Sequence, residues 1–453
     1  MSRIVLLVAA LLAAGLACTG DAMPGSSTKE PPNILIIVAD DQRADTLSSM
    51  PAVSRWFGRQ GTRFTKAFAT TPQCCPSRAS ILTGRYAHNH GVLTNSDTSR
   101  LDETTTLQRY LSDAGYTTAI VGKYLNRVGS YFDRENAAID PRYFDTWATF
   151  LGGYDDPLFN IDGRLRRMEG YSTRLVSELA LESLESLDTE KPSPWLLYVA
   201  PFAPHKPYQP EEQYEAARVD ELAADRAFME RIRRDKPRYV RRTELKARQA
   251  RRVREQQLRT LRSVDDMVDD LFRALEELGE SRNTLAFYLS DNGYLWGEHG
   301  VMDKGYPYLE SVQIPLLVRW PGRVSEGVKD PRLVANIDVL PTILDAAGIE
   351  ARSGDPIDGA SLFAATSRDE IVLEFAGLLK RQIPPWAGLI GRDFQYVEYY
   401  GTDGGEVIDR EYYDLARDPL QLQNLVATSS INVPRSMSEK LSLLRDCVGE
   451  ACP

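Results

Sequence analysis

Short apolar runs separated by amphipathic stretches are the feature that most constrains the fold of this chain. The runs hardly alternate polar with apolar side chains, which is typical of strands buried on both faces of a parallel sheet. The stretches between them repeat apolar residues at helical spacing. Strands that alternate with helices in this way predict an α/β sheet covered by helices on both faces. The runs are residues 33–39, 117–121, 195–200, 284–290 and 315–320, and the helical stretches are 103–114, 170–187, 259–278 and 337–347.

The pattern changes after about residue 359. Four shorter stretches joined by turn residues predict antiparallel strands, and a helix is expected over 436–445. We therefore expect a catalytic α/β domain over 33–358 and a smaller α+β domain over 359–453. The charged residues 211–254 are expected to form a largely helical insertion. The four shorter stretches are 371–375, 387–390, 394–400 and 411–414.

The N-terminus predicts export. Arg3 precedes an apolar run over residues 4–17, which as a helix would be about 21 Å long against the roughly 30 Å of a bilayer core. Residues 1–18 therefore read as a signal peptide and 19–32 as a linker, which predicts an extracellular, cell-surface or periplasmic protein. Cys18 ends the run as in bacterial lipoproteins, so lipidation of Cys18 and ordinary cleavage both stay open.

Charge and cysteine content fit an exported protein that does not bind nucleic acid. The chain has 54 basic and 64 acidic residues, a net charge of −10, which argues against a general nucleic-acid binder. We expect membrane contact only through a lipid on Cys18. Cys447 and Cys452 are expected to form a disulfide, as an oxidising compartment would allow.

Acidic residues collect directly after two of the predicted strands. Asp40 and Asp41 follow 33–39, and Asp291 and Asn292 follow 284–290. Ligands of open α/β sheets bind beyond the carboxyl ends of the strands, and neighbouring carboxylates repel one another unless a cation lies between them. A site with only oxygen ligands suits Ca²⁺ or Mg²⁺ rather than Zn²⁺. The alternative is a helix cap at the first pair and a turn at the second.

Basic side chains also collect in loops at or near the ends of predicted strands. Imidazole is suited to proton transfer near neutral pH, and several cations around a divalent metal describe a pocket for an oxyanion. The alternative for each is a structural histidine or a solvated lysine. The candidates are His88, His90, His205, His299, Lys123 and Lys304.

Residues 74–84 predict a helix with a reactive N-terminus. Pro76 suits its first turn and Gly84 its end. Cys74 would then lie where the helix dipole favours negative charge, with Arg78 one turn further on. From the residues alone, Cys74 is either a thiolate nucleophile with a lowered pKa or part of a structural turn.

These motifs resemble the sulfatase family of the alkaline-phosphatase superfamily. Cys-Cys-Pro-Ser-Arg followed by Leu-Thr-Gly matches the family signature, with Cys74 at the position that the family oxidises to formylglycine. Ala-Pro-His, Ser-Asp-Asn-Gly and Gly-Glu-His-Gly also match. His88-Asn89-His90 is similar to the N-acetylglucosamine-6-sulfatase branch. The resemblance implies an alkaline-phosphatase-like fold and the hydrolysis of sulfate esters of a sulfated carbohydrate.

The resemblance also implies roles for single residues. Ca²⁺, rather than Mg²⁺, would bind with an oxygen of the modified Cys74, which a formylglycine-generating enzyme would produce. Arg78 would hold the formylglycine. The other implied metal ligands are Asp40, Asp41, Asp291 and Asn292, and the residues that would contact sulfate or the leaving oxygen are Lys123, His205 and Lys304.

One departure from the family concerns the segment after Lys123. Many sulfatases have Gly-Lys-x-His, whereas Tyr124 and Leu125 follow Lys123 here. Asn126 is the candidate for part of the role of the missing histidine. The remaining expected substrate contacts are His88, His90 and His299.

Three other functions compete with a sulfatase. They are a phosphomonoester or phosphodiester hydrolase on the same fold, a catalytically dead polysaccharide-binding protein, and a thiol redox protein that uses Cys74 and Cys75. Residues 231–254 carry ten Arg and two Lys against two acidic residues. They read either as a solvated, partly ion-paired helix or as a surface that attracts a sulfated polysaccharide.

Overall fold

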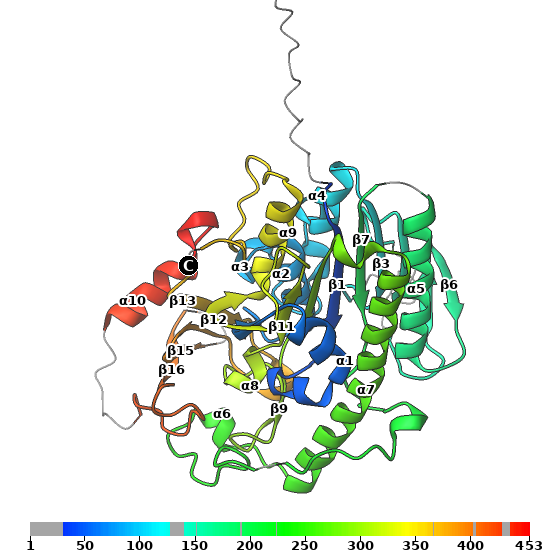
Figure 1. Ribbon diagram of the computed structural model, residues 1–453. Helices are drawn as coiled ribbons and strands as arrows, with labels where there is room; N and C mark the ends of the chain where they lie inside the picture. Colours follow the sequence, from blue (N-terminus) through cyan, green and yellow to red (C-terminus); the bar gives the residue numbers. More distant parts are fainter. Residues whose placement is uncertain are drawn as a thin grey trace, which may run out of the picture. The chain divides into compact units, whose positions relative to one another are not determined.

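A ten-stranded mixed sheet forms the centre of the protein (Figure 1). The computed structural model describes residues 30–126, 140–150, 152–190, 193–222, 224–365, 367–401, 405–427 and 435–453. The predicted signal peptide and most of the predicted linker lie outside these residues. The strand order is β12-β2-β11-β8-β1-β7-β3-β4-β5-β6.

Four neighbouring strands of this sheet are parallel, as the sequence predicts. β8, β1, β7 and β3 pair in that order with all strands pointing the same way. They are β1 (Asn33–Ala39), β3 (Thr117–Gly122), β7 (Trp195–Ala200) and β8 (Thr284–Ser290). The carboxyl ends of four buried strands therefore meet at one edge of the sheet.

The prediction of a parallel strand over 315–320 is wrong. β11 (Leu316–Arg319) is antiparallel to β8 and also to β2 (Thr62–Phe68). Between β8 and β11 the chain forms only the hairpin strands β9 (Leu295–Trp296) and β10 (Met302–Asp303) and the short helix α8 (Leu309–Val312). A parallel return needs a crossover, usually a helix, that carries the chain back along the sheet. The only described helix in this connection has four residues, so the chain stays near the edge where β8 ends and β11 runs back from there.

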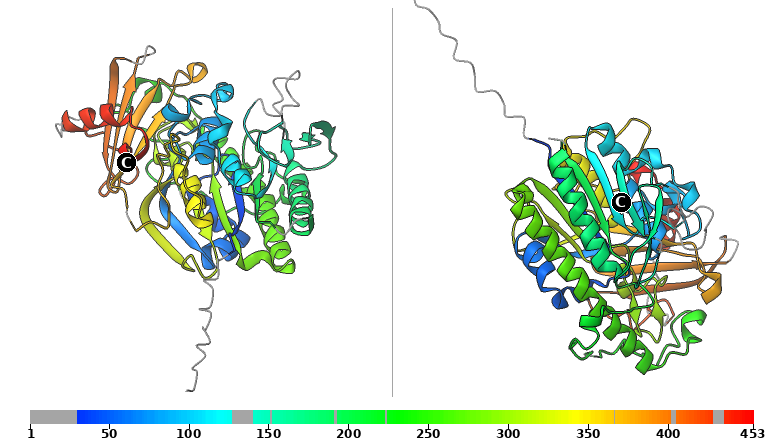
Figure 2. Two further views of the ribbon diagram at one scale, coloured as in Figure 1. Left: turned by 90° about the horizontal axis from the view of Figure 1, so that it is seen from above. Right: turned by 90° about the vertical axis from the view of Figure 1, so that its right-hand side faces the viewer.

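Helices cover both faces of the sheet, which confirms the predicted fold class. Alternate residues of β1 belong to two separate apolar cores: Leu35 and Ile37 face one, and Ile34 and Ile36 face the other. The first core is completed by α5 (Ser172–Glu190) and α7 (Ala247–Glu277), which run side by side in Figure 2. The second is completed by α2 (Cys74–Thr83), α4 (Leu107–Asp113) and α9 (Val339–Ala347).

A small antiparallel sheet follows, as predicted for the C-terminal part. Its order is β13 (Glu370–Phe375), β14 (Trp386–Gly391), β15 (Phe394–Tyr400) and β16 (Val407–Asp414), and α10 (Arg435–Leu444) comes next. The predicted disulfide between Cys447 and Cys452 is present. Pro32–Pro453 form one compact unit, so a domain boundary at residue 358 stays a prediction.

The expected helical insertion over 211–254 is mostly irregular. Its described residues form a 3-10 turn at Glu212–Tyr214, the short helix α6 (Arg238–Arg241) and the beginning of α7. Closely spaced like charges disfavour a helix, and Pro237 cannot lie in a helix interior.

The remaining elements are short or lie at the margins of the sheet. They are α1 (Pro51–Val53), α3 (Ala87–His90), β4 (Thr146–Phe150), β5 (Leu158–Ile161), β6 (Arg164–Arg167) and β12 (Val328–Ala335).

In the described part of the chain, no helix combines the length and apolar character needed to cross a membrane.

Candidate active site

The carboxyl ends of β1 and β8 bring three carboxylates together. Ala39 lies opposite Ser290 in the parallel register, so the residues that follow each strand are neighbours. The Asp41 amide donates to Oδ1 of Asp291 at 3.1 Å. Carboxylate oxygens of Asp40, Asp41 and Asp291 lie within 4.8 Å of one another, and all three residues are buried.

This carboxylate cluster has the chemistry of a site for a hard divalent cation. It offers charged oxygen ligands, which Ca²⁺ and Mg²⁺ prefer. Nδ2 of Asn292 donates to Oδ1 of Asp41 at 2.7 Å, so Asn292 borders the cluster. Burial alone would raise the pKa of Asp40, but Lys123 and then His205 outweigh it and hold the pKa at about 2. Asp40 is therefore an anion at physiological pH.

Helix α2 places Cys74 against this cluster. Cys74 is the first residue of the helix, which ends at Gly84 in the left-handed conformation, as the sequence predicts. Sγ of Cys74 lies 3.6 Å from Oδ1 of Asp40. Burial raises the pKa of the Cys74 thiol to about 12, although Lys123 and Lys304 oppose the shift. This direction of the shift argues against a thiolate nucleophile with a lowered pKa at the unmodified Cys74.

Arg78 lies one helical turn after Cys74 and is buried. Its Nε donates to Oδ2 of Asp291 and its Nη1 to the carbonyl of Lys123, each at 2.8 Å. Burial would lower the pKa of Arg78, but Asp291 and Asp40 raise it, so the side chain is a cation. Among the described residues, Nη2 of Arg78 has no hydrogen-bond partner. A buried unpaired donor on a cation fits an anionic oxygen.

Two lysines complete the ring of cations. Lys123 follows β3 and its Nζ pairs with Asp40. Lys304 follows β10, pairs with Asp41, and has its Nζ 2.8 Å from Sγ of Cys74. Burial would lower the pKa of each lysine, but Asp40 raises that of Lys123 and Asp41 that of Lys304.

His205 is the more open member of the group. It follows β7, and one of its ring nitrogens, Nε2, lies 3.9 Å from Oδ2 of Asp41. The other, Nδ1, is 2.7 Å from the carbonyl of Lys206 and therefore carries a proton. With 28% of its side chain exposed, His205 lies between the buried cations and solvent.

The expected substrate contacts of His90 and His299 are wrong. His90 lies beneath α2, where its ring nitrogens meet Oγ of Ser80 and the amide of Val92. His299 has no exposed surface, and its Nδ1 is 2.8 Å from Glu230. Burial is the main reason that the pKa of each falls to about 3. Both are neutral histidines of the interior.

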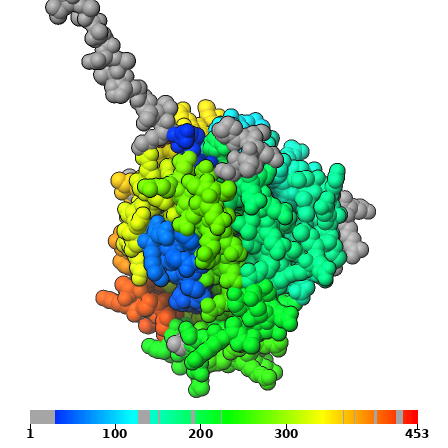
Figure 3. Space-filling model, turned by 45° about the vertical axis from the view of Figure 1, so that its right-hand side comes forward, coloured from blue at the N-terminus to red at the C-terminus, as the bar shows by residue number. Residues whose placement is uncertain are grey.

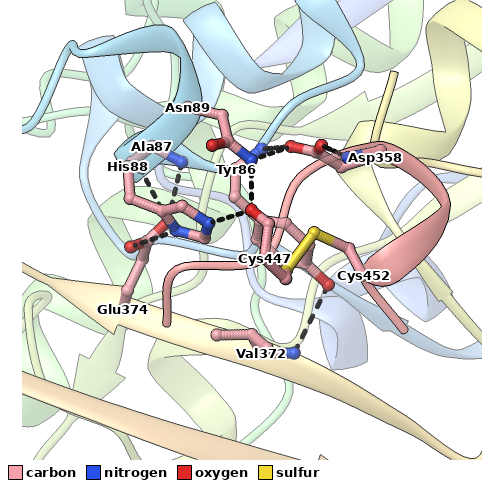
Figure 4. The surroundings of a disulfide bond; sticks show 10 residues. Tyr86, Ala87, His88, Asn89, Asp358, Val372, Glu374, Cys447 and Cys452 are labelled. Carbon is pink, nitrogen blue, oxygen red and sulfur yellow. Dashed lines mark hydrogen bonds and ion pairs between the residues drawn. A yellow bond between two sulfur atoms is a disulfide. The ribbon is translucent and has the colours of Figure 1, made fainter. Parts of the chain in front are cut away.

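His88 is also engaged within the protein. Figure 4 shows it between the small sheet and the C-terminal disulfide. Its Nδ1 is 3.0 Å from Oε2 of Glu374, and its Nε2 is 3.1 Å from the carbonyl of Cys447. Both ring nitrogens are thus occupied, so that His88 links α3 to the C-terminal part, and a substrate contact of His88 stays a prediction.

Asn126 lies beside Cys75 rather than Cys74. The backbone amide of Asn126 donates to Sγ of Cys75, and its side-chain Nδ2 donates to the carbonyl of Asn95, each at 3.3 Å. The described contacts therefore do not give Asn126 the role of the missing family histidine.

Three residues that hold the site in place through hydrogen bonds are not among the residues predicted from the sequence: Ser77, Asn95 and Asn336. Oγ of Ser77 donates to the carbonyl of Asp291 and in turn accepts from Nδ2 of Asn336 at 2.8 Å. Oδ1 of Asn95 accepts from the amide of Cys75 at 2.9 Å. Ser77 could have been found from its place in the signature, whereas Asn95 and Asn336 carry no signal in the sequence.

Comparison with known proteins adds to this geometry. The family model described as "Sulfatase" matches residues 32–349, and one described as "N-sulphoglucosamine sulphohydrolase, C-terminal" matches 297–446. The chain belongs to the sulfatase family. It is a sulfuric ester hydrolase, and the resemblance seen in the sequence is confirmed.

Curated relatives of this sulfatase include sugar sulfatases. Human N-acetylglucosamine-6-sulfatase is 30% identical over 93% of this chain and 86% of the relative. The N-acetylglucosamine-6-O-sulfatase of Bacteroides thetaiotaomicron is 26% identical over 96% of this chain and 89% of the relative.

Solved structures share the fold of this sulfatase. One, described as in complex with its substrate D-glucosamine-2-N,6-O-disulfate, has a TM-score of 0.79 at 23% identity and covers 91% of this chain and 97% of its own. The phosphonate monoester hydrolase of Agrobacterium radiobacter has a TM-score of 0.70 at 22% identity, over 91% and 95%.

Proposed function

We propose that this sulfatase is exported and hydrolyses sulfate esters of a sulfated sugar, with Ca²⁺ and a formylglycine derived from Cys74. Relatives over nearly the whole chain are named as N-acetylglucosamine-6-sulfatases, and a structure of the same fold is described with a glucosamine disulfate substrate. Relatives named as extracellular sulfatases support export. A formylglycine-generating enzyme would be the partner during maturation.

The unpaired Nη2 of Arg78 is the observation that carries the proposal. It is a buried cationic donor beside Cys74 and the carboxylate cluster, and the oxygens of a sulfate group or of a modified residue 74 would satisfy it. Asp40, Asp41, Asp291 and Asn292 would hold Ca²⁺, with an oxygen of residue 74 in place of the sulfur.

The charges of the site match a sulfate ester. Three carboxylates face three cations, Arg78, Lys123 and Lys304, so these side chains are neutral together. A bound dication would add two positive charges and polarise oxygen. The transition state carries about two negative charges, one from the ester and one from the attacking hydroxyl. This cancellation in a buried site lowers the barrier.

Each side chain then has a task. A hydrated aldehyde at residue 74 would supply one hydroxyl to attack sulfur, with its proton passing to a carboxylate of the adjacent cluster, and a second hydroxyl whose deprotonation would release sulfate and restore the aldehyde. Arg78 orients residue 74 and the sulfate oxygens, while Lys123 and Lys304 hold the sulfate. His205, which reaches solvent, protonates the leaving sugar oxygen.

Replacing Cys74 tests the proposal. Cys74→Ser should be unable to turn over repeatedly, because serine lacks the second hydroxyl, and should accumulate sulfated protein. Mass spectrometry of the residue-74 peptide should show formylglycine in wild-type protein from a host that produces the modification. Repeated turnover by Cys74→Ser, or a plain thiol in fully active wild-type protein, would refute it.

A phosphonate or phosphate ester hydrolase is the second candidate, because phosphonate monoester hydrolases share the fold. Values of kcat/KM should be compared for sulfate, phosphate and phosphonate esters of one leaving group. We expect the sulfate ester to be preferred, and a preference for either phosphorus ester would reverse the assignment.

A further inference from the structure

A strongly basic surface lies on the irregular segment before α7 and on the first turns of that helix. Residues 231–252 contain eleven cationic and two acidic side chains, a local charge of +9 in a chain of net charge −10. Nine of the cations are exposed, against one exposed acid, Glu244. We call these nine the basic surface: Arg231, Arg234, Arg238, Arg241, Arg242, Lys246, Arg248, Arg251 and Arg252.

The charge of the basic surface is not neutralised within the described protein. None of its nine side chains has a described carboxylate within 4.0 Å, although Arg251 lies over the ring of Phe228. Elsewhere, Arg174 pairs with both Glu211 and Asp266. Within residues 231–254, Lys236 is ion-paired with Glu230 and Asp235, whereas the nine side chains of the basic surface are solvated and available to an anionic partner.

The segment is anchored to the hairpin that leads to Lys304. Phe228 and Glu298 form an isolated antiparallel β-bridge, and the backbone amide of Met229 donates to the carbonyl of Gly297 at 2.8 Å. Nη1 of Arg233 donates to the carbonyl of His299 at 3.2 Å. Figure 1 shows α6 and β9 at the same end of the molecule, and Figure 3 shows the green segment at the surface there. The segment that carries the basic surface is therefore attached to the hairpin that leads to Lys304 in the active site.

Its anchors are buried while its cations are exposed. Nζ of Lys236 donates to the carbonyls of Gln421 and Leu422 at 2.8 and 3.0 Å and is fully covered. Internal contacts therefore fix the backbone and leave the exposed guanidinium groups available. Guanidinium binds sulfate in a two-pronged geometry that ammonium lacks, and eight of the nine side chains are arginines.

We propose that the basic surface binds a sulfated polysaccharide chain next to the active site, so that the enzyme captures polymer rather than free monosaccharide. This inference rests on the proposed function, since it names the form in which the sulfated sugar is presented. Several sulfates of one chain would engage several arginines together, and attraction would raise the rate of capture.

The test compares two variants with the same loss of charge. The first is Arg231→Gln, Arg234→Gln, Arg238→Gln and Arg241→Gln. The control is Arg59→Gln, Arg100→Gln, Arg164→Gln and Arg166→Gln, four exposed arginines outside the basic surface that also have no described carboxylate within 4.0 Å.

Binding is measured first, without turnover. In a Cys74→Ala background, the first variant should elute from immobilised heparin at clearly lower salt, and the control as the parent does. Activity is measured next: kcat/KM on a sulfated polysaccharide should fall about tenfold, mainly through KM, and kcat/KM on 4-nitrophenyl sulfate should not change.

Each other result has a defined meaning. Equal effects of both variants, or equal effects on polymer and aryl sulfate, would overturn the inference. Retention by anionic vesicles or DNA but not by heparin would also overturn it and assign the surface to another partner. If wild-type protein cleaves no sulfate ester but heparin binding depends on the basic surface, the proposed function fails and the binding assignment stands.

Discussion

At the scale of single residues, the site depends on anions and cations buried together. The Asp291 carboxylate receives hydrogen bonds from Arg78 and from the Asp41 amide. Asp291 therefore binds the guanidinium of Arg78 and would also bind the expected metal. Replacing this one carboxylate should disturb both.

Asp291→Asn should lose calcium and activity together. The amide keeps the shape of the side chain but removes a charged ligand, so we expect more than about tenfold loss of Ca²⁺ affinity and loss of turnover. Metal analysis of the purified variant checks this. Saturating Ca²⁺ should raise the free energy of unfolding of the wild type by about 2.7 kcal/mol at a hundredfold excess over Kd, and of the variant far less. A variant that keeps calcium with full affinity would refute Asp291 as a ligand.

His205→Ala should affect poor leaving groups most. A sugar alkoxide must be protonated as it departs, whereas 4-nitrophenolate is stable as an anion. We expect about 10²–10⁴-fold loss of kcat on a sugar sulfate and a much smaller loss on 4-nitrophenyl sulfate. Equal losses on both substrates would mean that His205 positions the substrate rather than supplying a proton.

The acidic residues at the two strand ends and helix α2 could be predicted because their signals are local. Asp40 and Asp291 directly follow apolar strands, and Pro76 and Gly84 delimit α2. The burial of His90 and His299 could not be predicted, because it depends on which distant segments pack over them. His299 is covered by Glu230 and Tyr308, neither of which a local pattern connects to it.

At the scale of elements, the parallel strands place the site and one glycine allows them to pair closely. Gly122 ends β3 with φ of 103°, and a Cβ there would lie 2.1 Å from the carbonyl oxygen of Ala200 in β7. The next residue is Lys123, whose amide bonds the same carbonyl at 2.8 Å.

Gly122→Ala should therefore damage stability and activity. The left-handed backbone costs about 1–3 kcal/mol for alanine, and relief of the contact would move Lys123. Gly115→Ala is the control, because Gly115 has φ of 88° but nothing within 4 Å of its Cβ position. Denaturant unfolding should show a larger loss for Gly122→Ala, and only this variant should lose activity. Equal stability and full activity in both would contradict the role given to Gly122.

Strand existence could be predicted better than strand direction. The apolar pattern of 315–320 found β11 but not its antiparallel orientation, because direction depends on the connection and not on the strand. The charged residues 211–254 are expected to be helical from their sequence. Their backbone is instead fixed by contacts with distant segments, such as those of Lys236 with the carbonyls of Gln421 and Leu422.

At the scale of the whole molecule, buried neutral histidines make stability depend on pH. The pKa of His90 falls to about 3, mainly through burial, from the usual 6.5. Below pH 6.5 the unfolded chain therefore takes up a proton that the folded protein excludes. The free energy of unfolding should fall as pH decreases from 6.5 towards 3.

His90→Asn tests this dependence. Each excluded proton contributes a slope of about 1.4 kcal/mol per pH unit, and Asn can still accept from the Val92 amide. The variant should be less stable near neutral pH but should show a shallower decline between pH 6.5 and 5. Chemical unfolding at several pH values gives both slopes, and parallel curves would contradict a neutral buried His90.

The burial of Cys74 would limit when the proposed oxidation of this residue can occur. In the folded protein, residue 74 is 3% exposed, lies in the first turn of a helix, and is contacted by Nζ of Lys304 at 2.8 Å. A modifying enzyme could not bind this segment once the protein has folded. Oxidation of residue 74 would then have to occur on a nascent or unfolded chain, before the part of the polypeptide some 230 positions downstream docks onto it. Slower folding would leave residue 74 accessible for longer and would therefore increase the fraction of active enzyme.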